Sequence, residues 1–282
     1  MGTLQKKLSN LKRDLRELES VLVAFSGGVD SAFLLKIAKD VLGEKAVAVT
    51  INSQIHPAFE LKDAKNLIRK LGVEHIILKV NALSNPKFVK NPPDKCYICK
   101  KDLFLKLKQI ARNEGIKYII EGSNYDDLKD FRPGRRALLE LNIKSPLVQA
   151  KLTKQEIRKL SKKLGLNDWD KPSNACLATR IPYGERITPE KLKRIEKAED
   201  FLKNLGVKQV RLREFAGQGG LARRSFSEGG ARIEVQEKDM PLVLKNRAKI
   251  IEKLTKLGYH YITLDLQGYR TGSMNEKIVN KG

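Results

Sequence analysis

The sequence predicts an α/β fold: a parallel β-sheet with helices on both faces, followed by a smaller α+β domain. Three observations lead to this prediction. Short continuous apolar runs, typical of strands buried on both faces, alternate with segments in which apolar residues recur at helical spacing. Glycines close several of the helical segments. The alternation stops at residues 170–184, where a loop containing Pro, Ser and Asn begins.

The first elements form one βαβ unit. Residues 21–25 are a continuous apolar run, and a glycine-containing loop follows at 26–31. Apolar residues then recur at helical spacing over 33–42, and 46–51 is a second apolar run. Parallel strands need such a helical crossover, so this unit predicts the parallel sheet.

The remaining elements continue this pattern to residue 165 and then change it. The capping-box sequence that begins at Thr153 and ends at Glu156 opens a helix. The other predicted elements of the first part are helices at 59–71 and 102–113 and strands at 75–80 and 118–121. The predicted elements of the second part are helices at 188–205 and 242–257 and strands at 207–213, 232–235 and 259–266. We therefore divide the chain into domains at residues 1–180 and 181–282.

Composition and charge narrow the classes of function. Of the 282 residues, 41% are hydrophobic, which is typical of a globular protein. No apolar run is long enough to span a bilayer or resembles a signal-peptide core, so we expect a soluble, cytoplasmic protein without membrane contact. Lys and Arg outnumber Asp and Glu by 56 to 33, a net charge of +23. Such a field attracts nucleotides, phosphorylated substrates or nucleic acid; the alternative is a solvated Lys-rich surface of a thermophilic kind.

The loop Ser26-Gly27-Gly28-Val29-Asp30-Ser31 has the composition of an anion-binding site. Glycine lets the backbone turn tightly and approach an anion, and the N-terminus of the following helix stabilises negative charge. The two serines add hydroxyl donors. Asp30 would repel phosphate, so it indicates a bridging magnesium ion or a contact with a ribose or a loop amide. The loop is neither a Walker A sequence nor a GxGxxG fingerprint, and the alternative is a purely structural turn.

This loop resembles the PP-loop of the ATP pyrophosphatase superfamily, whose domain is of the adenine nucleotide alpha hydrolase-like kind. The resemblance implies a protein that cleaves ATP between the α- and β-phosphates and leaves AMP on its substrate. It assigns Ser26, Gly27, Gly28, Asp30 and Ser31 to the triphosphate of ATP, together with Mg²⁺. The motif indicates that the substrate is activated by transfer of AMP, but it does not identify the substrate.

Three cysteines, Cys96, Cys99 and Cys176, occur in a chain without a recognisable secretion signal, so we expect no disulfide framework. The Cys-Tyr-Ile-Cys spacing places two sulfurs within reach of one metal or of each other. Cys176 lies in a loop expected at the C-terminal edge of the sheet, where ligands of parallel α/β folds bind. Four interpretations stay open: a zinc site completed by His56 or His75, a redox pair, ordinary core cysteines, and three ligands of an iron–sulfur cluster.

Six further segments carry a more specific signal. They are residues 96–104 (CYICKKDLF), 121–124 (EGSN), 131–134 (FRPG), 175–184 (ACLATRIPYG), 231–234 (ARIE) and 264–272 (LDLQGYRTG). With these segments, the whole chain resembles the LarE family of pyridinium-3,5-biscarboxylic acid mononucleotide sulfurtransferases, which help to build the nickel-pincer nucleotide cofactor.

The LarE family has two types, and this sequence has the pattern of the type with three cysteines. That pattern resembles a site for a 4Fe-4S cluster with one iron open to carry extra sulfide. The resemblance implies that Cys96, Cys99 and Cys176 are cluster ligands and, with Asp30, catalytic residues. The other type sacrifices one cysteine, which becomes dehydroalanine, so Cys176 as a sacrificed sulfur donor is the alternative.

Arg211 and Arg213 are two residues apart on a predicted strand, so their side chains project from the same face. Paired guanidinium groups at this spacing suit a phosphate or a carboxylate. The resemblance assigns them, with Thr179 and Arg180, to the phosphate of the substrate. The alternative is a pair of solvent-facing arginines, because alternate positions of an antiparallel strand are commonly solvated.

Two groups of residues have no assigned role. The Gly- and Arg-containing loop from Phe215 to Gly230 departs from the family pattern, and it is either a lid over an anionic substrate or a surface insertion. The candidates for magnesium or substrate contacts are Asp126, Asp127, Asp130, Glu199 and Glu234, although a solvated carboxylate is the more frequent case.

The resemblance implies an ATP-dependent sulfurtransferase. A carboxylate of a pyridinium mononucleotide would attack the α-phosphate of ATP, and sulfur would then displace AMP. The expected partners are this small-molecule nucleotide and sulfide or a sulfur-donor protein, and a homo-oligomer is compatible with the sequence. One alternative is a tRNA thiolase, which needs an RNA-binding surface; the sequence has no recognised RNA-binding module. The other is a non-catalytic nucleotide-binding regulator.

Overall fold

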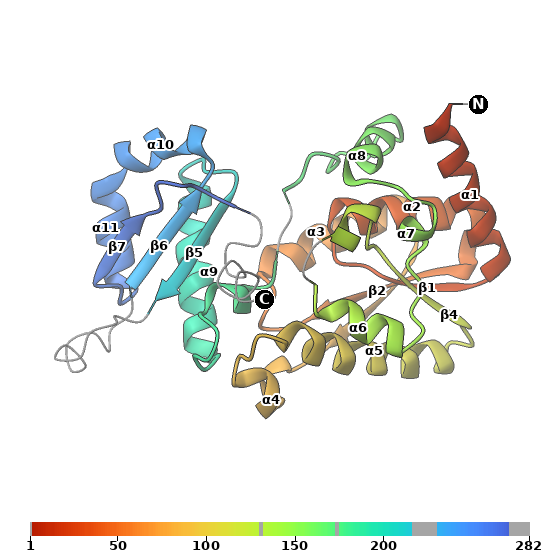
Figure 1. Ribbon diagram of the computed structural model, residues 1–282, viewed down its shortest axis with the longest axis horizontal. Helices are drawn as coiled ribbons and strands as arrows, with labels where there is room; N and C mark the ends of the chain where they lie inside the picture. The colour runs from red at the N-terminus through yellow and green to blue at the C-terminus, as the bar shows by residue number, and fades with distance from the viewer. Residues whose placement is uncertain (1, 130–131, 173–174, 216–229, 271–282) are drawn as a thin grey trace. The chain divides into compact units, whose positions relative to one another are not determined.

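The computed structural model describes residues 2–129, 132–172, 175–215 and 230–270 (Figure 1). Contacts divide the chain into two compact units, Met1–Ala82 with Asp94–Asn174 and Leu83–Pro93 with Ala175–Gly282. The chain therefore leaves the first unit after Ala82 and returns to it at Asp94.

The first unit contains the parallel sheet that the sequence predicts. Strand β1 (Val21–Ala24) pairs in parallel with β2 (Ala46–Asn52) and with β4 (Tyr118–Glu121), and β2 pairs in parallel with β3 (Glu74–Lys79), which gives the order β3-β2-β1-β4. The register places Ala24 opposite Val49 and Glu121. The carboxyl ends of β1 and β4 therefore lie side by side, and the loops that follow them meet at one edge of the sheet.

Helices cover both faces of this sheet, as predicted (Figure 1). Val21 and Val23 of β1 belong to the core on one face, and Leu22 belongs to the core on the other. This alternation explains why the strand reads as a continuous apolar run. The helices on the first face are α1 (Thr3–Leu18), α2 (Val29–Leu42), α3 (Ala58–Leu71), α7 (Pro146–Gln149) and α8 (Lys154–Lys163), and those on the second are α5 (Lys95–Asn113) and α6 (Gly134–Glu140).

The second unit is a smaller α+β arrangement. Strand β6 (Gly230–Val235) lies between β5 (Val210–Phe215), to which it is antiparallel, and β7 (Tyr261–Leu264), to which it is parallel. The helices of this unit are α4 (Pro86–Val89), α9 (Pro189–Asn204), α10 (Met240–Lys245) and α11 (Arg247–Lys256), of which α9 packs against β5. None of the helices in the described ranges is both long and apolar enough to cross a membrane.

Several elements differ from the prediction. Helix α5 begins at Lys95 rather than at residue 102, so both cysteines of the Cys-Tyr-Ile-Cys sequence lie in its first two turns. The helix predicted at 242–257 is two helices that meet at Asn246. Residues 83–93 group with the second unit, where the Asn91 side chain donates to Ile181 O and Pro182 O at 3.2 and 2.7 Å.

Candidate functional site

The PP-loop connects the carboxyl end of β1 to the first turn of α2. Gly27 has a φ of 73°, a left-handed conformation that favours glycine, and Gly28 is the extended N-cap of α2. The first N–H groups of a helix have no partner within that helix, and together with the helix dipole they form an anion site. The backbone therefore has the form of a phosphate cradle.

The two serines of the loop play different parts. Ser31 is 3% exposed, and its Oγ accepts from Ser26 N at 3.3 Å and donates to Gly28 O at 3.0 Å. Ser26 is exposed, and its Oγ lies 3.1 Å from Ser31 Oγ. Ser31 thus holds the two ends of the loop together, while the Ser26 hydroxyl lies at the surface of the cradle.

Gly122, which follows β4, supports the cradle from the neighbouring strand. A Cβ atom at this position would lie 2.9 Å from Ser31 N and 3.1 Å from Ser31 Cα. Both are backbone atoms of the PP-loop, so a side chain at residue 122 would displace the loop. The Glu121-Gly122 sequence belongs to a segment that resembles the LarE family. Its steric role could not be predicted from the sequence, because this role depends on the packing of β4 beside β1.

Asp30 is bound by residues that the sequence did not assign to the site. Lys154 Nζ, at the start of α8, lies 2.9 and 2.8 Å from the two carboxylate oxygens, and Asn124 Nδ2 donates to Oδ2 at 3.1 Å. Side chains of Asp30 and Lys154 are 18% and 29% exposed, so solvent reaches the pair. The repulsion that Asp30 would exert on a phosphate is therefore offset by an adjacent ammonium group.

Two of the candidate carboxylates organise the loop around Asn124. Asp126 accepts from Lys154 N at 2.8 Å, and Asp127 accepts from Asn124 N at 3.0 Å and pairs with Arg132 at 2.8 Å. Burial raises the pKa of Asp127, and the charges of Asp30 and Glu121 raise it further, while Arg132 opposes both. A concentration of negative charge thus lies at this edge of the sheet, beside Lys154.

Cys96 and Cys99 lie near the same edge. They are three residues apart in the first two turns of α5, so their side chains share one face of the helix. Lys100, in the same two turns, reaches Glu121 at 3.9 Å. A Cβ atom on Gly134 would lie 3.3 Å from Cys96 O, so the start of α6 packs closely on these turns.

Cys176 lies in the second unit, at the N-cap of the short 3-10 helix Leu177–Arg180. Its carbonyl oxygen accepts from Thr179 N at 3.0 Å, from Thr179 Oγ1 at 2.8 Å and from Arg180 Nη1 at 3.0 Å. All three cysteines are partly exposed thiols. They are donors of the kind that iron–sulfur clusters take, so the residues fit such a group chemically.

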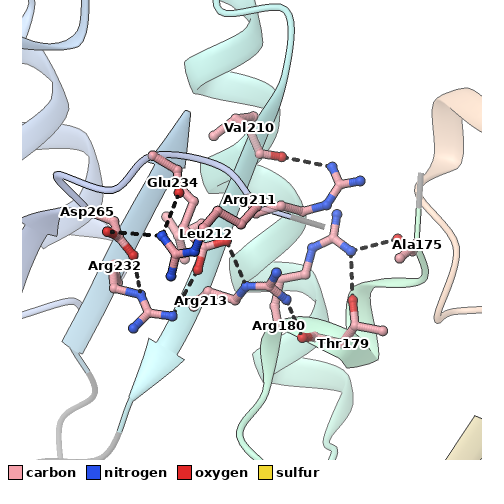
Figure 2. A network of polar contacts seen from close by, with 12 residues as sticks. Ala175, Thr179, Arg180, Val210, Arg211, Leu212, Arg213, Arg232, Glu234 and Asp265 are labelled. Carbon is pink, nitrogen blue, oxygen red and sulfur yellow. Dashed lines mark hydrogen bonds and ion pairs between the residues drawn. The ribbon is translucent and has the colours of Figure 1, made fainter. Parts of the chain in front are cut away.

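Arg180 is committed to protein contacts (Figure 2). Its side chain is 1% exposed and forms a two-point ion pair with the 2% exposed Glu199, at 2.8 and 3.0 Å. Burial opposes ionisation, but the charge and hydrogen bonds of Arg180 lower the pKa of Glu199. The alternative of a solvated carboxylate is wrong for Glu199, since this carboxylate is buried and paired.

Arg211 and Arg213 are buried on β5, 4% and 7% exposed, so the alternative of solvent-facing arginines is wrong. Arg213 binds Glu234 at 3.1 Å and Thr179 O at 2.7 Å, and Arg211 donates to Val210 O (Figure 2). The guanidinium of Arg211 also lies over the Tyr269 ring. Burial and then the charge of Arg180 lower the pKa of Arg211 to about 10, so its guanidinium stays protonated at neutral pH. Several cationic groups are thus gathered around the Cys176 turn.

Some of the residues singled out from the sequence lie outside the part of the chain that the structure describes. Asp130, residues 216–229 of the Gly- and Arg-containing loop, and residues 271–272 of the last motif lie outside the described residues. Among the described residues, no group of three or more His, Cys, Asp or Glu side chains is placed to hold a metal ion. His75, one candidate for a zinc site, shares a hydrogen bond with Thr50 Oγ1 at 2.9 Å.

Comparison with known proteins gives three findings. A sequence model of the NAD synthase family matches residues 4–93, which include the PP-loop. The chain is 35% identical over 279 residues to the pyridinium-3,5-bisthiocarboxylic acid mononucleotide synthase of Lactiplantibacillus plantarum, covering 99% of this chain and 97% of that protein. It is 39% identical to an uncharacterized protein of Synechocystis, covering 98% and 99% of the two chains.

Proposed function

Because the chain belongs to the LarE family of PP-loop proteins, we propose that it is an ATP-dependent sulfurtransferase of nickel-pincer nucleotide cofactor biosynthesis. Its substrate is a pyridinium mononucleotide with ring carboxylates. The observation that carries the proposal is a formed PP-loop cradle in a chain that matches the named synthase over almost its whole length. This length of match, which includes the second unit, favours the small-molecule substrate over tRNA.

In the first step, a carboxylate oxygen of the substrate attacks the α-phosphorus of ATP. A new P–O bond forms, the bond between the α-phosphorus and the bridging oxygen breaks, and pyrophosphate leaves. The backbone of Gly27 and Gly28 and the N-terminus of α2 support the negative charge that grows on this leaving group. The product is an acyl-adenylate, whose carbonyl carbon is a good electrophile.

Asp30 and Lys154 adjust the charge of the cradle. Asp30 would hold a magnesium ion that neutralises the leaving pyrophosphate, since a carboxylate is an oxygen ligand of the kind Mg²⁺ prefers. In the structure the ammonium group of Lys154 is paired with Asp30. Once magnesium binds Asp30, this ammonium group is free to contact the phosphate oxygens. Lys154 thus neutralises the charge of Asp30 before the nucleotide binds.

In the second step, sulfur replaces AMP. Hydrosulfide attacks the acyl carbon, the C–O bond to AMP breaks, and one proton is released as the thiocarboxylate forms. A 4Fe-4S cluster held by Cys96, Cys99 and Cys176 would supply an open iron site that binds sulfide. The N-terminal end of α5 suits two of these ligands, because a helix N-terminus stabilises negative charge such as that of thiolates. Sulfide itself or a sulfur-donor protein would replenish the sulfur.

Arg211 and Arg213 are assigned to the anionic substrate. Both are buried beside one another on β5, and Arg213 donates to the carbonyl of Thr179. Guanidinium groups in a desolvated site bind phosphate and carboxylate strongly. Their burial excludes a solvated surface pair, and the spacing on one strand and the family resemblance support the anion site.

The products of ATP cleavage test this proposal. With ATP, Mg²⁺ and pyridinium-3,5-biscarboxylic acid mononucleotide, we expect AMP and pyrophosphate to form, and their formation to require the substrate. Ion-exchange chromatography of the nucleotides checks this. ADP and phosphate as products would contradict the PP-loop assignment, and no cleavage with this substrate would favour a nucleotide-binding regulator.

Replacement of Lys154 by methionine is expected to weaken MgATP binding about tenfold or more, the cost of losing a hydrogen bond to a charged group. Titration calorimetry measures the effect. Lys171→Met is a matched control, since Lys171 also forms a 2.8 Å ion pair with an aspartate of the first unit, Asp63, which the site does not use. Equal losses in both variants would show that Lys154 acts only through stability.

A further inference from the structure

One buried ion pair in the second unit contacts both the Cys176 turn and the strand that carries Arg211 and Arg213. Arg180 and Glu199 are 1% and 2% exposed and are joined by two hydrogen bonds. Their burial shows that the pair is not a surface contact, and Arg180 also donates to Ala175 O, Cys176 O and Thr179 Oγ1 (Figure 2). The pair therefore calls for a role other than direct binding of the substrate phosphate.

On one side, Arg180 determines the shape of the Cys176 turn. Its Nη1 donates to Ala175 O at 2.6 Å, to Cys176 O at 3.0 Å and to Thr179 Oγ1 at 2.9 Å. Thr179 Oγ1 in turn donates to Cys176 O. A planar guanidinium makes these bonds in one fixed orientation, which a lysine cannot reproduce.

On the other side, Glu199 is joined to β5. Its Oε1 accepts from Leu212 N at 2.9 Å, and Leu212 lies between Arg211 and Arg213 in the sequence. One carboxylate thus binds both the side chain that shapes the Cys176 turn and the backbone between the two arginines.

We propose that the Arg180–Glu199 pair is a positioning pair, which holds the Cys176 turn in place and fixes it relative to Arg211 and Arg213. The proposal rests on the proposed function, in which Cys176 serves the sulfur chemistry and the two arginines serve the anionic substrate. It replaces the earlier assignment of Arg180 to the substrate phosphate. The role is exerted through the backbone of residues 175–179.

The test uses the reactivity of the Cys176 thiol in the apoprotein. In a chain with Cys96→Ser and Cys99→Ser, Cys176 is the remaining cysteine, so its alkylation by iodoacetamide can be followed by mass spectrometry. Arg180→Lys keeps the positive charge but loses the planar guanidinium group, which donates several hydrogen bonds in a fixed geometry. We expect the Cys176 thiol of this variant to be alkylated about tenfold faster, because fewer hydrogen bonds hold the turn in place. In the chain with all three cysteines, the same substitution should lower the iron bound after anaerobic reconstitution.

Arg194→Lys is the matched control. Arg194 also joins α9 to β5, through Glu214 at 2.6 Å, and lies over the Tyr259 ring. The Arg194→Lys substitution should lower the melting temperature without changing the rate of Cys176 alkylation. Equal acceleration in both variants, or none in Arg180→Lys, would overturn the proposal. Should Arg180→Lys not fold, Thr179→Val removes the hydroxyl bonded to Cys176 O and should accelerate alkylation too. Alkylation needs neither ATP nor a cluster, so its outcome is independent of whether the proposed function holds.

Discussion

Replacement of Cys176 by alanine is expected to remove the iron of the anaerobically reconstituted protein, from about four atoms per chain to near zero. Thiocarboxylate formation should fall to background. Pyrophosphate release should persist, because the PP-loop and its supports Gly122, Asn124 and Lys154 belong to the first unit, whereas Cys176 belongs to the second. Iron and sulfide analysis, with a visible absorption spectrum, measures the first effect.

The Cys99→Ala variant distinguishes sulfur transfer through a cluster from sulfur transfer by a sacrificed Cys176. With a cluster, this variant should lose iron and thiocarboxylate formation as Cys176→Ala does, since both thiols are ligands of the same group. If Cys176 is instead a sacrificed donor, Cys99→Ala should stay active for one turnover, and the intact protein should lose the mass of H₂S. A colourless wild-type protein that cannot be reconstituted, together with that mass loss, would contradict the cluster.

Replacement of Gly122 by alanine is the second large effect. The added Cβ would lie 2.9 Å from Ser31 N, so the PP-loop backbone must move. A misplacement of reacting groups by about 1 Å costs about 100-fold in rate. We therefore expect AMP formation to fall by about that factor. Chromatography of the nucleotides in the presence of substrate measures it.

Gly43→Ala is the control for lost stability. Gly43 has a positive φ, of 60°, but a Cβ there meets nothing within 4 Å, and the residue lies at the opposite end of α2. Alanine at such a φ is strained and should destabilise by about 1 kcal/mol while AMP formation is retained. If Gly122→Ala behaved like Gly43→Ala, the close contact between β4 and the PP-loop would have no bearing on catalysis.

Much of the first unit could be predicted from local signals. The continuous apolar runs at 21–25 and 46–51 identified strands buried on both faces, and helix α2 begins right after the glycine pair. The start of α5 was missed, because the residues of its first turns, such as Lys95, Tyr97 and Lys100, have no apolar periodicity. The grouping of residues 83–93 with the second unit depends on contacts such as Asn91 to Pro182, which are remote in the sequence.

The same limit applies to the site. The PP-loop residues are contiguous, so their composition and setting were sufficient to predict an anion cradle. Lys154 was missed because it is 124 residues from Asp30 and is brought to it by the packing of α8. The resemblance assigns Arg180 to the substrate phosphate, whereas its burial with Glu199 is the observation behind the positioning role proposed above.

The most direct test of the account is the mass of the reaction product. The protein is incubated anaerobically with MgATP, sulfide and pyridinium-3,5-biscarboxylic acid mononucleotide, and the nucleotide product is analysed by mass spectrometry. We predict a product in which one carboxylate oxygen is replaced by sulfur, formed with one AMP and one pyrophosphate per sulfur inserted. AMP formation without sulfur in the product, under conditions that retain the iron, would contradict the account.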